Sequence, residues 1–284
     1  MTTPMQALSM TDYLALPWLS AGLCHLLLDR SPFHARHEFL RRPEDDNDAA
    51  DVGTAIHDVL LEGRDRIEAI DAPDWRTKAA KEARDRAREA GLIPLLRHKV
   101  ANVYGAVEAA QAVMAGSEFA MPWASNATVE HTLIWKDVLG TRCKIRPDWL
   151  SDTTPASMLL IHVKTTLGSA RPESWIRNHL VPAGYDVAAA FYGRGCQEAL
   201  DMPCRPRSVF LVVEQREPWG CSLIALAPAA QAIAELKVER AIRIWADCEA
   251  SGKWPCYPTA VQYAEPTAWQ FAEAQYAEED HAKL

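Results

Sequence analysis

The sequence predicts a mixed α/β fold, in which a central sheet is flanked by helices and preceded by a helical N-terminal portion. Two observations carry this prediction. Segments before residue 122 combine strong helix formers with helix caps, whereas segments after it are short, rich in β-branched residues and separated by turn signals. The order is helices, three strands, a helix, two strands and a final helix. Neither a repeat nor a low-complexity linker interrupts it, so we expect one integrated domain.

Helices are expected throughout residues 1–122. Asp12 is a candidate cap for a helix that runs to Leu28 and stops at Ser31-Pro32. Gly63 and Gly91 are expected to end two later helices. The expected helices of this portion cover residues 12–28, 32–40, 52–61, 77–90 and 95–114, with a polar loop at 41–48.

Strand-like segments begin after Pro122, and turn signals such as Gly140 separate them. Strands are expected at residues 128–135, 141–150, 158–165, 208–214 and 221–226, with helices at 183–200 and from Pro228 onward. These elements define a core at residues 123–258. The acidic tail at 259–284 is expected to be a frayed terminus.

Composition excludes several classes of protein. The chain has 284 residues, 49% of them hydrophobic, which is typical of a folded globular protein. No apolar run reaches the roughly 18 residues of a membrane helix, and we see no signal peptide, so we expect a cytoplasmic protein without membrane contact. The seven cysteines include no Cys-x-x-Cys pair, which argues against a zinc or iron–sulfur site.

Positive charge is concentrated in one segment, although the net charge is −8. Between Arg76 and Lys99, eight lysines and arginines stand against three acidic residues. Such a helix is most often a solvated surface, but in a protein that binds nucleic acid it is a candidate surface for phosphates.

Three short motifs hold the residues best suited to chemistry. Gly53-Thr-Ala-Ile-His57 places a histidine on a helix one turn after a glycine. Arg146-Pro-Asp148 ends one expected strand, and His162-Val-Lys164-Thr-Thr166 ends the next. His162 and Lys164 are two residues apart, so on a strand they point to the same face. Taken singly, each has a simpler explanation, as a packed histidine, a turn aspartate or a surface lysine.

The order of a strand, Pro-Asp, a second strand and X-x-Lys resembles the PD-(D/E)XK nuclease superfamily, and within it the RecE-like and lambda-exonuclease branch. The resemblance implies a restriction-endonuclease-like core. The segments that match the RecE-like branch are, in chain order, Tyr13 with Leu19-Ser20, Ser31-Pro32, Gly53–His57, Lys144–Asp148, Lys164–Thr166, Tyr185–Tyr192, Glu214 and Trp254-Pro255.

The resemblance implies a divalent metal, Mg²⁺ or Mn²⁺, and roles for four residues. Asp148 corresponds to a metal ligand, and Lys164 to the catalytic lysine that positions or activates the attacking water. His57 matches the helix histidine beside the metal. Glu130 matches an upstream acid that can help hold metal or water. Such a metal polarises the phosphate and lowers the pKa of a bound water.

Two positions depart from the family pattern. His162 stands where the family has an acid, and Ala188 stands where the branch has glutamine. Imidazole is a poorer ligand for Mg²⁺ than a carboxylate but an acceptable one for Mn²⁺, so a metal set of Asp148, His57 and His162 would favour Mn²⁺. Ala188 cannot offer the hydrogen bonds of a glutamine side chain. Neutral drift in an inactive site is the alternative explanation of His162.

The resemblance implies a metal-dependent DNA exonuclease that resects duplex ends 5′ to 3′ in phage-type recombination, as a homo-oligomeric ring with a RecT-type annealing protein as partner. Alternatives are a catalytically impaired DNA-binding or scaffold protein, and a regulator of a host nuclease or recombinase. His162 and Ala188 favour loss of activity, and Asp148 and Lys164 favour its retention. The candidate DNA contacts are Arg76, Lys78, Lys81, Arg84, Arg88, Arg146, Thr165, Thr166, Tyr185 and Tyr192.

Overall fold

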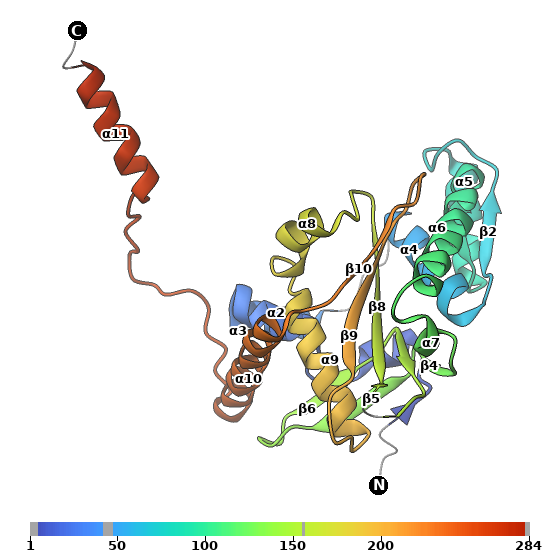
Figure 1. Ribbon diagram of the computed structural model, residues 1–284, viewed down its shortest axis with the longest axis horizontal. Coiled ribbons are helices and arrows are strands. Elements are labelled where there is room, and N and C mark those ends of the chain that lie inside the picture. Colours follow the sequence, from blue (N-terminus) through green and yellow to red (C-terminus); the bar gives the residue numbers. More distant parts are fainter. Residues whose placement is uncertain (1–4, 42–47, 155–156, 282–284) are drawn as a thin grey trace.

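A five-stranded mixed sheet forms the centre of the computed structural model, which describes residues 5–41, 48–154 and 157–281 (Figure 1). Its strands, in spatial order, are β10 (Cys221–Ile224), β9 (Arg207–Glu214), β8 (Leu159–Thr166), β7 (Trp149–Ser151) and β4 (Ala127–Val129). β8 and β9 run parallel, and the other neighbours are antiparallel. The predicted mixed sheet between helices is confirmed.

A second, three-stranded sheet consists of β1 (Met5–Gln6), β5 (Thr132–Lys136) and β6 (Arg142–Ile145). The expected strands at 128–135 and 141–150 are each wrong as single elements, because each is broken and contributes to both sheets. The breaks fall at Glu130, which has φ 52°, and at Pro147-Asp148. They lie against each other, since the amide of Glu130 donates to the carbonyls of Pro147 and Asp148. The two strand-to-strand corners therefore place two acidic side chains together.

Helices cover both faces of the central sheet (Figure 1). On one face, α2 (Ala21–Asp29), α9 (Tyr185–Ala199) and α10 (Pro228–Ser251) form a core with Leu160. On the other, α4 (Asp48–His57) and α6 (Arg97–Ala115) pack on the alternate residues of β8, including Ile161 and Val163. The alternation follows from the two-residue period of a strand.

The N-terminal portion differs from expectation in two ways. The helix expected at 12–28 is two helices, α1 (Met10–Ala15) and α2. A parallel strand pair, β2 (Ile67–Ile70) and β3 (Ile93–Leu96), joins the helices and was not expected. Each strand has only four residues, β2 contains Glu68 and β3 contains a proline, so neither carries a strand signal by itself. The crossover that pairs them is α5 (Lys78–Glu89).

The remaining elements are mostly helical. α3 (Pro32–Leu40) agrees with expectation, whereas residues 42–47 of the expected loop lie outside the described residues. The helix expected at 52–61 is α4, continued by the π-helical turn η1 (Asp58–Glu62) up to Gly63. Short helices α7 (Ala120–Trp123), α8 (Pro172–Trp175) and η3 (Ile176–Leu180) complete the body. The tail, expected to be frayed, contains the helix α11 (Ala268–His281), which projects from the body (Figure 1). Among the described residues, no helix is long and apolar enough for a membrane span.

Candidate functional site

Asp148 lies in the corner between β6 and β7, beside the middle of β8. Its Oδ2 accepts a hydrogen bond of 2.8 Å from the amide of Val163. The same oxygen lies 4.0 Å from Nζ of Lys164. Lys164 Nζ also lies 5.6 Å from the centre of the Tyr185 ring, at the start of α9. The expected convergence of the Pro-Asp and X-x-Lys motifs is therefore present in the fold.

Glu130 extends from the other corner toward two basic groups. Arg146 Nε donates to its Oε2 over 2.7 Å, and Nδ1 of His57 lies 3.7 Å from its Oε1. Burial raises the pKa of the Glu130 carboxyl, but the hydrogen bonds and charges of His57 and Arg146 outweigh burial, so the net effect lowers it. Glu130 is thus held ionised with one oxygen facing His57.

His57 owes its position to the close packing of α4 on β8. Gly53 lies one helical turn earlier, and a Cβ atom there would be 2.9 Å from Oγ1 of Thr165. Thr165 is held in turn by Nε2 of Gln215, which donates to Oγ1 over 2.9 Å. The glycine of the Gly-x-x-x-His motif therefore has a steric role: it lets α4 approach the strand so that the histidine reaches the acids.

The side chains of His57, Glu130 and Asp148 form a group whose potential ligand atoms all lie within 4.8 Å of one another. They offer one imidazole nitrogen and carboxylate oxygens, a donor set suited to Mn²⁺ and, through its oxygens, to Mg²⁺. Glu130 is ionised, as metal binding requires. The residues present therefore fit a divalent metal ion.

His162 lies outside this group. Its side chain is 3% exposed and stacks on Phe210 of β9 with ring centres 4.9 Å apart. It meets Tyr192 of α9 edge to face, and its Nε2 has no hydrogen-bond partner among the described residues. Burial lowers the pKa of His162 to about 4, so the ring is neutral at pH 7. The structure brings Glu130, and not His162, together with His57 and Asp148.

Lys144 and Arg146 fasten the N-terminal segment beside the site. Lys144 Nζ donates to the carbonyls at the end of α1, at 2.7 Å from those of Tyr13 and Leu16. Arg146 Nη1 donates to the carbonyl of Leu8 over 2.7 Å. Arg146 was a candidate DNA contact. It lies in a largely internal environment, and its side chain is 12% exposed.

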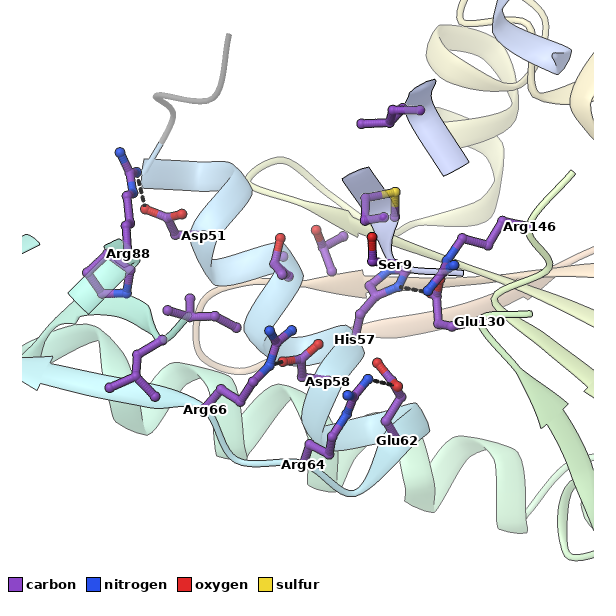
Figure 2. A pocket seen from close by; sticks show the side chains of 18 of the residues that line it. Ser9, Asp51, His57, Asp58, Glu62, Arg64, Arg66, Arg88, Glu130 and Arg146 are labelled. Carbon is purple, nitrogen blue, oxygen red and sulfur yellow. Dashed lines mark hydrogen bonds and ion pairs between the residues drawn. The ribbon is translucent and has the colours of Figure 1, made fainter. Parts of the chain in front are cut away.

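A cavity of about 1230 Å³ extends from His57 and Glu130 along α4 and η1 (Figure 2). Arg146 and Thr165 line the same end, and Arg64, Arg66 and Arg88, with their acidic partners, line the rest of its charged wall. Leu8, Met10 and Leu14 supply apolar side chains to the lining. Arg64 and Arg66 were not predicted from the sequence, where their only signal is that they follow the glycine that ends the His57 helix.

The other expected DNA contacts are dispersed. Within the basic segment only Arg88 reaches the cavity, whereas Arg76 pairs with Asp74 and Lys78 with Glu82 on exposed surface. Lys81 is exposed, and Arg84 lies over the ring of Trp75.

Thr166, at the end of β8, accepts a hydrogen bond from the amide of Gly168. Tyr185 and Tyr192 lie on α9, beside Lys164 and His162 respectively. Ala188 packs partly buried against the core of α9 and α10.

Comparisons with known proteins agree with this fold. The crystal structure of a protein described as "Putative exonuclease" from Eubacterium rectale superposes with a TM-score of 0.54 at 11% identity, covering 95% of this chain and 99% of that one, which shows a shared fold. A second structure, of SSO0001, gives a TM-score of 0.28 at 14% identity over 78% of this chain and 84% of that one, too low to carry an argument. No curated protein sequence matches. The family model "PDDEXK-like domain of unknown function (DUF3799)" matches residues 27–267, and the chain therefore belongs to this PD-(D/E)XK family.

Proposed function

We propose that this protein is a metal-dependent exonuclease that acts on the ends of duplex DNA. Membership of a PDDEXK-like family supports a nuclease-type hydrolase in general. The observation that carries the proposal is the group of His57, Glu130 and Asp148, with Lys164 Nζ 4.0 Å from Asp148. A hydrolase of this type needs a metal-binding group and a cation beside the attacked phosphate, and this arrangement supports both roles.

His57, Glu130 and Asp148 would hold the metal ion, which polarises the phosphodiester and lowers the pKa of a bound water. Lys164 can donate hydrogen bonds to the attacking water and stabilise the negative charge that develops on the phosphate oxygens. Arg146 keeps Glu130 ionised and oriented, and the amide of Val163 does the same for one oxygen of Asp148. These five residues and the Val163 amide would form a pre-organised site.

The rival proposal is a DNA-binding or scaffold protein that has lost catalysis. In the sequence, His162 was one of two departures favouring that reading. The position of Glu130 weakens the argument, because Glu130 supplies a third potential ligand without help from residue 162. We therefore favour the active enzyme. Its polarity of 5′ to 3′, a homo-oligomeric state and a RecT-type partner in phage recombination rest on the resemblance, and a cytoplasmic location completes the proposal.

A digestion assay tests this function. Linear duplex labelled at either 5′ or 3′ end, and the same DNA as a closed circle, are incubated with protein in Mg²⁺, in Mn²⁺ or in EDTA. We expect stepwise loss of the linear substrate in at least one metal, no loss in EDTA and an intact circle. Lys164→Ala should be inactive, whereas Arg171→Gln, which changes an exposed arginine paired with Glu173, should match wild type. Wild type no faster than Lys164→Ala in both metals would overturn the proposal in favour of the binding protein.

A further inference from the structure

The cavity beside the metal group contains a row of arginines held by carboxylates, and we infer that this row binds the phosphates of a single DNA strand on its way to the site. The inference rests on the proposed function and names the form of the substrate. Four arginine–carboxylate pairs line the cavity (Figure 2). They are Arg88 with Asp51, Arg66 with Asp58, Arg64 with Glu62 and Arg146 with Glu130.

The acidic partners of three of these arginines come from one stripe of a single helix. Asp51, Asp58 and Glu62 are seven and four residues apart on α4 and its continuation η1, a spacing that keeps side chains on one side of a helix. The row therefore follows the helix that presents His57 to Glu130. A chain of phosphates lying along these guanidinium groups would be led to the metal group.

The carboxylates orient Arg64 and Arg66 and leave N–H donors for a phosphate, although Arg66 also donates Nη1 to the carbonyl of Gly91 over 3.4 Å. Arg146, which is 12% exposed and also donates to the carbonyl of Leu8, instead holds Glu130 at the end of the row. A guanidinium has five N–H donors in a planar fork, and one carboxylate engages only one or two of them. Arg66 uses Nε for Asp58, at 2.6 Å. The Arg64 side chain is 54% exposed, and its acidic partner stands two residues before it in the chain. This ion pair is local, so Arg64 does not hold distant elements together. Because Arg64 is exposed and lines the cavity, a role in binding is its best explanation.

The dimensions of the cavity favour one strand over a duplex. Its volume of about 1230 Å³ is little more than the roughly 300–1,000 Å³ of small-molecule pockets. That space holds a few nucleotides. Leu8, Met10 and Leu14 also line the cavity, so a strand with its phosphates on the arginines would have apolar side chains available for its bases. A duplex end would have to open before one of its strands could enter.

Binding measurements test this inference apart from cleavage. The probe is a 12-nucleotide single strand with a 3′ fluorophore, measured by anisotropy in EDTA and in Ca²⁺, with a blunt 12-base-pair duplex for comparison. Arg64→Gln is compared with Arg171→Gln, a matched control. Each arginine pairs with an acid two residues away in the chain and each change removes one charge, but Arg171 does not line the cavity.

We expect Arg64→Gln to weaken single-strand binding about threefold to tenfold at low salt. It should also reduce the slope of log K against log salt by about 0.7, the value for one lost phosphate contact on a single strand. Arg171→Gln should leave both unchanged. The double variant Asp58→Asn/Arg66→Gln removes both charges of one pair, so it leaves no buried carboxylate without a partner. It should weaken strand binding and reduce the salt slope as Arg64→Gln does.

Three outcomes would overturn the inference: Arg64→Gln indistinguishable from Arg171→Gln, wild type binding the duplex more tightly than the strand, or no binding in either EDTA or Ca²⁺. None of these decides whether the protein cleaves DNA, because the digestion assay answers that separately. Conversely, an effect of Arg64 on binding in a protein without cleavage would keep the strand path and reject the nuclease.

Discussion

The two histidines of the site lie in opposite surroundings. His57, at the end of α4, borders the open cavity and has its Nδ1 3.7 Å from Glu130. His162, on β8, is enclosed by Phe210 and Tyr192, and its Nε2 has no partner among the described residues. The same side chain is a potential metal ligand in one place and a packed aromatic ring in the other. Residue type therefore says little about metal binding until the neighbours and the access of solvent are known.

The largest expected effect concerns which side chains hold the metal. Asp148→Asn should reduce cleavage by about a thousandfold or more, because it removes charge from the metal group and from the partner of Lys164. His57→Ala should cost about a hundredfold. His162→Phe, which keeps the stacking on Phe210, should cost less than tenfold. Rates on linear duplex in Mn²⁺ measure all three. A His162→Phe enzyme as impaired as His57→Ala would mean that His162 acts in catalysis and is more than a packed ring.

The next effect concerns stability and pH. The folded pKa of His162 is about 4, mainly through burial, with Asp148 raising it and Lys164 lowering it. In the unfolded chain the value is about 6.5. Between these values the unfolded histidine takes up a proton and the folded one does not, so stability is complete above pH 6.5 and falls as pH drops toward 4. The loss from this group should approach about 3 kcal/mol.

Urea unfolding at pH 7 and pH 4.5 measures this loss. His162→Phe serves as the reference, because it retains the other titrating groups and lacks this one. The wild-type protein should lose more stability than the variant between the two pH values. Equal losses in both would show that His162 is protonated in the folded state and therefore more accessible than its packing indicates.

The smallest expected effect tests how α4 delivers His57. Gly53→Ala places a methyl group 2.9 Å from Thr165 Oγ1, and overpacking of this kind costs about 1–3 kcal/mol. Activity should fall with stability, since the helix that carries His57 must shift. Thr165→Ala removes the obstructing hydroxyl, so the double variant should recover most of the thermal stability of Thr165→Ala alone. If the stability losses of the two single variants simply add in the double variant, the contact between positions 53 and 165 does not limit how closely α4 packs on β8.

Several features of the fold could be predicted because they depend on local chemistry. Ser31 and Pro32 begin α3, and Thr77 caps α5 by accepting from the amide of Ala80. The pair β2–β3 could not be predicted, because its stability comes from a parallel partner more than twenty residues away. The helix α11 was also missed, since an acidic, unpacked tail carries no helical apolar stripe.

The sequence by itself determined that Asp148 and Lys164 would meet, because a Pro-Asp corner and a lysine on the neighbouring strand need only a sheet to bring them together. It also placed His162 on the face of Lys164, through the two-residue period of a strand. Only the tertiary structure decided that Glu130 joins His57 while His162 is buried. These outcomes depend on the left-handed corner at Glu130, on the approach of α4 allowed by Gly53, and on Phe210 and Tyr192 covering the imidazole. All three are contacts between residues far apart in the chain, and no local pattern specifies them.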